Sequence, residues 1–233
     1  MANKACGQPL DPANQVVVDR WREKGLARLG LMSSQTWNDD PKRLLFMLAR
    51  YKFVAKMLAG RDRVLEIGCG DAFGSRVVRQ AVGALTAVDI EPLFVEDARE
   101  RMDPAWPIDV RCHDMLAGPL PERFDAAYSL DVLEHIPPAE ESRFLDHVKQ
   151  SIGFHGVFVV GMPSLESQAY ASPQSRLGHL NCKSGEELRA VVERHFHNVF
   201  LFSMNDEVVH TGFAKMAHYL LALCCNPKTV GGE

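Results

Sequence analysis

The sequence predicts an α/β fold, in which a mostly parallel sheet carries helices on both faces. Apolar, β-branched runs typical of strands alternate with helical patterns between residues 63 and 161. One of these strands ends in Gly68-Cys69-Gly70, as expected where backbone must approach a ligand closely. With 233 residues, of which 46% are hydrophobic, the chain is long enough for one domain with a sizeable core.

The expected elements follow one another with short connections. Strands are expected at residues 63–67, 84–89, 108–112 and 156–160, and helices at 41–58, 73–82, 93–102 and 139–150. Ser184, with Glu187 three residues later, has the pattern of a capping box, which starts a helix that continues to Phe196. A strand at 199–204 and an apolar tract from Val208 onward then complete the sheet, with residues 205–207 as a turn between them.

The loop after strand 63–67 has the composition of a cofactor-binding loop. It leads into helix 73–82, whose first N–H groups and dipole favour a carboxylate or phosphate. The next glycine, Gly74, lies four residues after Gly70, whereas the dinucleotide fingerprint places it three residues later. Glu66 would repel a pyrophosphate but attract a sulfonium or an α-amino group. Asp89, at the end of the next strand, is suited to accept hydrogen bonds from a ribose diol.

These motifs, in this order, resemble class I S-adenosylmethionine-dependent methyltransferases, the broad group that includes the ubiquinone-biosynthesis O-methyltransferases. The resemblance covers about residues 44–220 and implies a Rossmann-like sheet of seven strands, with the last inserted antiparallel. It implies that the glycine loop contacts the methionine part of the cofactor, residues 89–90 and 114–115 the ribose and adenine, and residues 130–131 the sulfonium. The implied contacts are Glu66, Gly68, Cys69, Gly70, Asp89, Ile90, Asp114, Met115, Leu130 and Asp131.

Helix 41–58 adds two further candidates for the cofactor site. Arg50 and Tyr51 lie just before the first strand, and one of them is expected to close over the cofactor, Arg50 by pairing with its carboxylate. The alternative is a solvated arginine and a tyrosine in the core.

Two segments outside the cofactor-binding core are expected to recognise the methyl acceptor. Residues 1–43 are predicted to be a substrate or lid segment, and residues 44–233 the S-adenosylmethionine-binding methyltransferase domain, within a single domain overall. The polar stretch 164–183 follows the fifth strand, and a long structureless insertion at that place is typical of a lid or a binding loop.

His135 and His179 are the candidates for catalysis. Transfer to a hydroxyl needs a base within hydrogen-bond reach, and histidine can serve at its ordinary pKa. Equally, His135 could cap a helix and His179 could bond within its own loop. Asp131, Glu134 and His135 also resemble an acid-x-x-Glu-His element that holds a divalent metal in some relatives, with His179 as a fourth ligand. Because Leu-Glu-His-Ile is also common in relatives without a metal, the sequence does not favour one.

Composition narrows the classes of partner. The formal charge of −4 counts against long nucleic acids as partners. The absence of any Cys-x-x-Cys pair counts against a zinc site. The sequence offers neither a leader segment nor a long apolar span, so a cytoplasmic protein without a membrane partner is expected. The predicted function is methylation of a hydroxyl on a small polar acceptor, such as a sugar, a nucleotide-sugar or a secondary metabolite. Methylation of RNA or protein, and cofactor binding without catalysis, are the alternatives.

Overall fold

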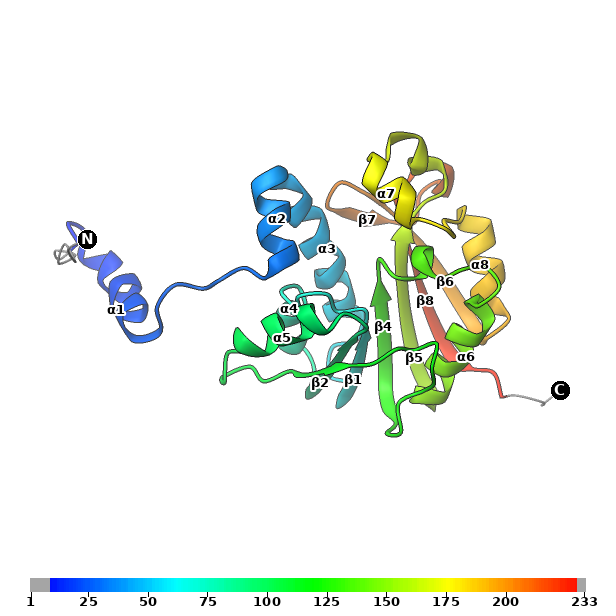
Figure 1. The fold of residues 1–233 in the computed structure, drawn as a ribbon, viewed down its shortest axis with the longest axis horizontal. Coiled ribbons are helices and arrows are strands. Elements are labelled where there is room, and N and C mark those ends of the chain that lie inside the picture. Colours follow the sequence, from blue (N-terminus) through cyan, green and yellow to red (C-terminus); the bar gives the residue numbers. More distant parts are fainter. Residues whose placement is uncertain (1–8, 230–233) are drawn as a thin grey trace.

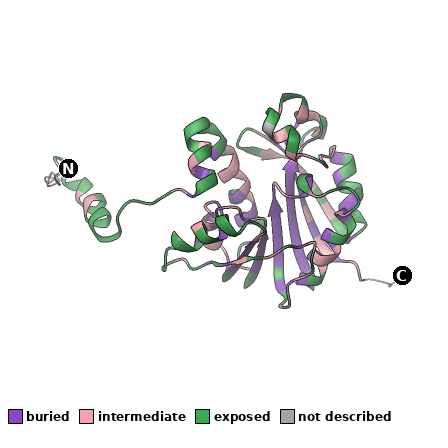
Figure 2. Cartoon of the chain, viewed as in Figure 1, coloured by how far each residue is buried: buried purple, intermediate pink, exposed green. Residues whose placement is uncertain are grey.

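A computed structural model describes residues 9–229, apart from the side chain of Gln174. The 3-10 turn η1 (Pro12–Asn14) and helix α1 (Gln15–Lys24) lie away from the body, at the end of an extended linker (Figure 1). Helix α1 buries none of its residues, and Figure 2 colours it exposed or intermediate throughout. The compact part of the chain therefore begins at about residue 30.

Eight strands form one sheet in the order β3-β2-β1-β4-β5-β8-β6-β7. Their bounds are β1 Arg63–Ile67, β2 Ala84–Asp89, β3 Asp109–Cys112, β4 Phe124–Leu130, β5 Ile152–Pro163, β6 Phe196–Asn205, β7 Val208–His210 and β8 Tyr219–Pro227. Strands β3, β2, β1, β4 and β5 pair in parallel, whereas β8 is antiparallel to both β5 and β6. The predicted antiparallel insertion of the last strand is confirmed.

The prediction of seven strands was wrong by one. The tract expected as a single strand from Val208 is interrupted: Val208–His210 turns back on β6 as β7, and β8 begins only at Tyr219. The expected turn between β6 and β7 is confirmed but spans only residues 206–207, because Asn205 still pairs with Val208 as the last residue of β6. An edge hairpin of this kind adds a strand without changing the order of the others.

Helices cover both faces of the sheet, as predicted (Figure 1). Their bounds are α2 Leu31–Asp39, α3 Lys42–Met57, α4 Ser75–Arg79, α5 Pro92–Glu100, α6 Glu141–Ser151, α7 Pro173–Gly178 and α8 Gly185–Glu193, with 3-10 turns η2 Leu133–His135, η3 Glu166–Tyr170 and η4 Ala214–Met216. Helices α3, α4 and α5 pack on one face, and α6 and α8 on the other. Alternation along the strands supplies both cores, since Val64 belongs to the first and Leu65 to the second.

Several predicted boundaries were wrong for local reasons. The helix expected at 73–82 spans only Ser75–Arg79, because residues 70–74 form turns that bring the glycine loop against Asp89. The capping box of Ser184 and Glu187 is confirmed, but α8 ends at Glu193, and Phe196 instead begins β6. The stretch 164–183 is not structureless, because it contains η3 and α7.

In the part of the chain that is described, no helix has both the length and the apolar character needed to cross a membrane.

Candidate active site

A cavity of about 530 Å³ lies at the carboxyl ends of the parallel strands, where open α/β sheets bind their ligands. It is lined by most of the residues expected to bind the cofactor: Tyr51, Gly68, Cys69, Gly70, Asp89, Ile90, Asp114, Met115, Leu130 and Asp131. His135 also lines it, whereas Arg50, Glu66 and His179 do not. The structure thus brings together residues from four consecutive strand ends.

The glycine loop is held by packing against protein side chains. Gly68 and Gly70 have positive φ angles of 76° and 52°, which residues other than glycine adopt only with strain. A Cβ at Gly68 would lie 2.1 Å from Val132 Cγ2, and one at Gly70 would lie 2.7 Å from Met32 Sδ. Both positions therefore need glycine because of the side chains that pack against them. This reason is separate from the close approach of a ligand that the sequence predicts.

Asp89 joins the second strand to the glycine loop. Its carboxylate accepts the backbone N–H of Gly70 at 2.7 Å and that of Glu91 at 2.9 Å. A carboxylate has about four acceptor sites, so capacity for a ribose diol remains. The ribose role of Asp89 stays a prediction.

The expected adenine end of the cavity is a tight turn after β3. Asp114 accepts the backbone N–H of Leu116 at 2.8 Å, and a ring nitrogen of His113 lies 2.9 Å from the Gly118 carbonyl oxygen. Met115 is buried, while Ile90 across the cavity is 68% exposed and so presents apolar surface. These positions suit a flat aromatic base, and the assignment to adenine stays a prediction.

Glu66 is buried beneath the glycine loop, where the hydroxyl of Tyr51 donates to its Oε1 at 2.9 Å. Burial raises the pKa of Glu66 to about 7, since a charged carboxylate is disfavoured away from water. Burial, together with Glu66, also raises the pKa of Tyr51, so the phenol remains a donor at neutral pH. A cation close to Glu66 would favour its charged form and so the loss of its proton.

Arg50 is engaged by the protein itself. Its Nη1 donates to both carboxylate oxygens of Asp131, at 2.9 and 2.7 Å, and its guanidinium lies 3.7 Å from the centre of the Tyr219 ring. Asp131 adopts a positive φ of 57°, a conformation unusual for a residue with a side chain. Pairing of Arg50 with the cofactor carboxylate stays a prediction, and it would require release from Asp131.

Glu134, His135 and His179 meet at one side of the cavity. Each side chain offers one possible ligand atom, and these three atoms all lie within 4.8 Å of one another. His135 and Gly178, the residue before His179, are 43 positions apart in the sequence. The main chain makes this approach possible, because the Glu134 carbonyl accepts the N–H groups of Leu180 and Asn181 at 2.8 and 2.9 Å. Asp131 is outside this group, so the predicted set of four ligands reduces to three.

Neither carboxylate oxygen of Glu134 has a hydrogen-bond partner, although the side chain is fully buried. Burial raises the pKa of Glu134 well above its ordinary value, and the charge of Asp131 raises it further. Burial also lowers the pKa of His179, as does its neighbour His135. A buried carboxyl without partners is costly, which marks this position as one prepared for a ligand.

Sequence reasoning missed one wall of the cavity. Met32, Ser33 and Thr36 of α2 line it, and Ser33 bonds to Asp71, which follows the glycine loop directly. The acid next to Gly70 was the one available signal, since no local pattern joins residues 33 and 71.

A mostly parallel sheet with an inserted antiparallel last strand, and a cavity walled by a glycine loop and an acid on the next strand, define a Rossmann-like cofactor-binding enzyme domain. The family described as "Methyltransferase domain" matches residues 64–156. A ubiquinone biosynthesis O-methyltransferase of Xanthomonas campestris pv. campestris (strain B100) is 28% identical over 135 residues, which are 55% of this chain and 56% of that protein. The chain thus spans about half the length of the curated relatives it matches.

Two solved structures share the fold. The N-methyltransferase NodS from Bradyrhizobium japonicum WM9, in complex with S-adenosylhomocysteine, superposes with a TM-score of 0.60 at 20% identity, covering 82% of this chain and 91% of that one. The DhpI-SAM-HEP complex superposes with a TM-score of 0.60 at 17% identity, covering 91% and 96%. These comparisons support a class I S-adenosylmethionine-dependent methyltransferase, with the family match confined to residues 64–156.

Proposed function

We propose that this protein binds S-adenosylmethionine in the cavity and transfers its methyl group to a hydroxyl oxygen of a small polar acceptor, such as a sugar, a nucleotide-sugar or a secondary metabolite. The observation that carries the proposal is the meeting of Glu134, His135 and His179 beside Asp131, where the sulfonium is expected. The X. campestris relative, named as an O-methyltransferase, supports oxygen as the methylated atom.

The two histidines are held in one orientation. Nδ1 of His135 donates to the Gly178 carbonyl at 2.8 Å, and Nδ1 of His179 donates to Gln168 Oε1 at 2.8 Å. In the neutral rings Nε2 is then left as an acceptor on each. Histidines that bind metals are oriented in this way, by donating the other ring N–H to a carbonyl or carboxylate.

The donor set fits a divalent cation. Two neutral imidazole nitrogens and one carboxylate are suitable ligands for a transition metal, and the unpartnered oxygens of Glu134 would gain the partner they lack. A cation held by these three side chains would act as a Lewis acid that lowers the pKa of the acceptor hydroxyl. We therefore include a divalent metal in the proposal, although the sequence alone did not favour one.

The rest of the catalytic effect comes from position. The glycine loop and Asp131 would fix the cofactor, while the segment around His179 would hold the acceptor oxygen behind the methyl carbon. As the oxygen bonds to that carbon, the carbon–sulfur bond breaks, S-adenosylhomocysteine leaves and the hydroxyl proton passes to solvent. In a metal-free alternative, Nε2 of His179 would take the proton directly.

The first experiment is to incubate the protein with methyl-labelled S-adenosylmethionine and size-fractionated cell extract, with and without a chelator. Label in the small polar fraction, lost on chelation and restored by a divalent cation, is the expected result. Transfer that resists chelation would favour the metal-free alternative. Label in RNA or protein would overturn the choice of acceptor, and no transfer despite measured binding of S-adenosylhomocysteine would indicate a binding protein.

A further inference from the structure

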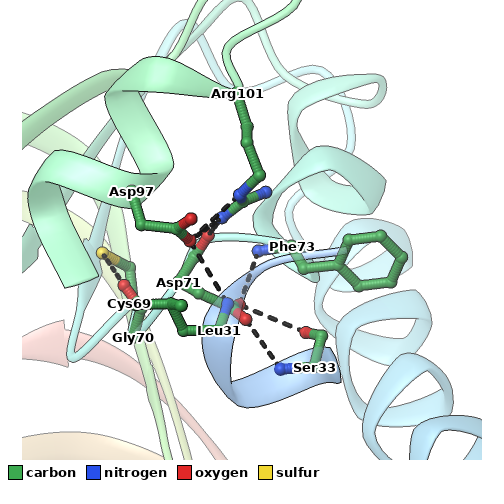
Figure 3. A network of polar contacts seen from close by, with 8 residues as sticks. All are labelled: Leu31, Ser33, Cys69, Gly70, Asp71, Phe73, Asp97 and Arg101. Carbon is green, nitrogen blue, oxygen red and sulfur yellow. Dashed lines mark hydrogen bonds and ion pairs between the residues drawn. The ribbon is translucent and has the colours of Figure 1, made fainter. Parts of the chain in front are cut away.

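The amino end of α2 is held by carboxylates from two other elements (Figure 3). Asp71 accepts the N–H of Ser33 at 2.7 Å and its hydroxyl at 3.2 Å, and Asp97 of α5 accepts the N–H of Leu31 at 3.3 Å. The first N–H groups of a helix have no partner inside it and carry partial positive charge. Two acids at that end therefore bind the helix both by hydrogen bonds and by its dipole.

Arg101 connects the two acids. Its Nε and Nη2 donate to Asp97 Oδ2 at 3.0 and 2.8 Å, and Nη2 also donates to the backbone carbonyl of Asp71. The Arg101 side chain is only 9% exposed, so water screens these contacts weakly. Although burial acts to raise the pKa of Asp97, Arg101 outweighs it and keeps that pKa below its ordinary value. One cation thus links the glycine loop, α5 and α2.

The approach of α2 to the glycine loop leaves no space between them. A Cβ at Gly30, just before the helix, would lie 2.2 Å from Asp71 Oδ2 and 2.5 Å from Arg101 Nη2. Met32, in the first turn of α2, has its Sδ against Gly70 and lines the cavity together with Ser33 and Thr36. Helix α2 therefore forms one wall of the cavity next to the glycine loop.

Apolar packing contributes little to holding α2 in place. Within this helix, all of which is described, Ser33 is the single buried residue. Leu31, Met32 and Trp37 are 45%, 47% and 54% exposed. Because the hydrophobic contribution scales with the apolar area removed from water, the polar contacts at its amino end account for much of its attachment.

We propose that Asp71, Asp97 and Arg101 form a clasp that holds α2 as a lid over the cofactor cavity, and that opening of this clasp sets the rate at which the cofactor enters and its product leaves. The proposal rests on the proposed function only in taking the ligand to be S-adenosylmethionine and its product. Asp97 and Arg101 do not line the cavity and are positioning residues, since they act on the ligand through α2, whereas Asp71 also lines the cavity. The lid predicted for residues 1–43 is thereby assigned to one helix.

The test compares Arg101→Gln and Asp97→Asn with the wild-type protein. Labelled S-adenosylhomocysteine is bound and then chased with an excess of unlabelled compound, and association is followed separately. Both rates are expected to rise about tenfold or more, because charged hydrogen bonds that hold the lid are lost, so the dissociation constant changes less than either rate. Damage to the glycine loop would instead weaken affinity without faster association, and that result would overturn the proposal.

Arg111→Gln is the matched control, because Arg111 also pairs with two acids, Asp109 and Glu122, but does not line the cavity. Its rates should equal those of the wild type. Hydrogen exchange of residues 31–39 in the ligand-free variants gives an independent measure of lid opening, and faster exchange is expected in both clasp variants. Faster exchange with unchanged ligand rates, or unchanged exchange, would overturn the proposal. Failure of all forms to bind S-adenosylhomocysteine would instead contradict the proposed function, while the exchange experiment would still test the clasp.

Discussion

Two buried glutamates, Glu66 and Glu134, have different surroundings. Glu66, below the glycine loop, has one oxygen bonded to the Tyr51 hydroxyl, and its pKa is raised by burial to about 7. Glu134, on the acceptor side, has no partner for either oxygen and lies beside two histidines. The Glu66 carboxyl can hold a proton stably in the ligand-free protein. The Glu134 carboxyl has no hydrogen-bond partner for either oxygen.

This difference indicates different ligands. A protonated carboxyl near neutrality needs only a modest positive charge to ionise, and the sulfonium and ammonium of S-adenosylmethionine provide it. A carboxyl without any partner, next to two oriented imidazoles, is better matched by a cation with several coordination positions. The five predictions below test the two sides of the cavity, beginning with the largest expected effect.

Replacing Glu134 by Gln should abolish most transfer and leave the cofactor in place. The amide keeps the size of the side chain but removes the anionic ligand, so kcat should fall about 100- to 1000-fold, or ~3–4 kcal/mol. Affinity for S-adenosylhomocysteine, measured by calorimetry, should change by less than about twofold, and the stability of the ligand-free variant should change little, because the neutral amide replaces a carboxyl whose charged form burial already disfavours.

Glu140→Gln serves as the control for that measurement, since Glu140 pairs with Arg143 at the start of α6 and does not line the cavity. Near-normal turnover by Glu134→Gln would remove Glu134 from the proposed mechanism.

The stability of the ligand-free protein should fall as pH rises, in part because of Glu66. Its folded pKa of about 7 lies above the ordinary value, so the native state binds the extra proton between those two pH values. The contribution is fully present below about pH 4.3 and is lost as pH rises through about 7, a total of roughly 3 kcal/mol. Denaturant titrations of the wild type and Glu66→Gln from pH 5 to 8 isolate this contribution as the difference between the two slopes.

The same group should couple cofactor binding to pH. Because a bound cation favours the charged carboxylate, affinity for S-adenosylmethionine should rise from pH 6 to 8 in the wild type and rise less in Glu66→Gln. If affinity rises equally with pH in the two proteins, Glu66 is not the group that couples cofactor binding to pH.

Much of the cofactor side could be predicted from the sequence because its contacts are local. Strands β1 and β2 match the expected ranges, since buried parallel strands are continuous apolar runs bounded by glycine or an acid. The shortening of α4 could not be foreseen, because it depends on turns that place Gly70 against Asp89, a tertiary contact.

The partners of charged side chains were the least predictable feature of the site. Arg50 pairs with Asp131 across 81 positions, and Ser33 with Asp71 across 38. Residue type marks Glu134, His135 and His179 as candidates, but no local pattern determines which acid an arginine reaches. Asp131, which resembles one acid of a metal-binding element, is instead paired with Arg50.

Asp89→Ala should weaken cofactor binding by ~1–3 kcal/mol, about 5- to 150-fold, since it removes charged hydrogen bonds. Its carboxylate also holds the N–H groups of Gly70 and Glu91, so part of the loss would come from a looser glycine loop. Asp89→Asn keeps one acceptor oxygen and should fall between the wild type and Ala. Calorimetry with S-adenosylhomocysteine checks the order, and an unchanged affinity in Asp89→Ala would contradict the ribose assignment.

Gln168 offers the finest test of the acceptor side, because it acts through His179. Its amide nitrogen donates to the Ser164 carbonyl at 3.2 Å, which turns its oxygen toward His179 Nδ1 at 2.8 Å. Gln168→Met removes the acceptor and should weaken metal affinity and kcat about tenfold, the lower end of the range for residues that orient a ligand. Gln168→Glu restores an acceptor and should recover most of the loss, whereas a purely packing role predicts that Met, of similar size, is tolerated and that Glu is not. Rescue by Glu would show that Gln168 acts by fixing the unprotonated Nε2 of His179 toward Glu134. Glu66 differs, because the Tyr51 hydroxyl already pairs with it.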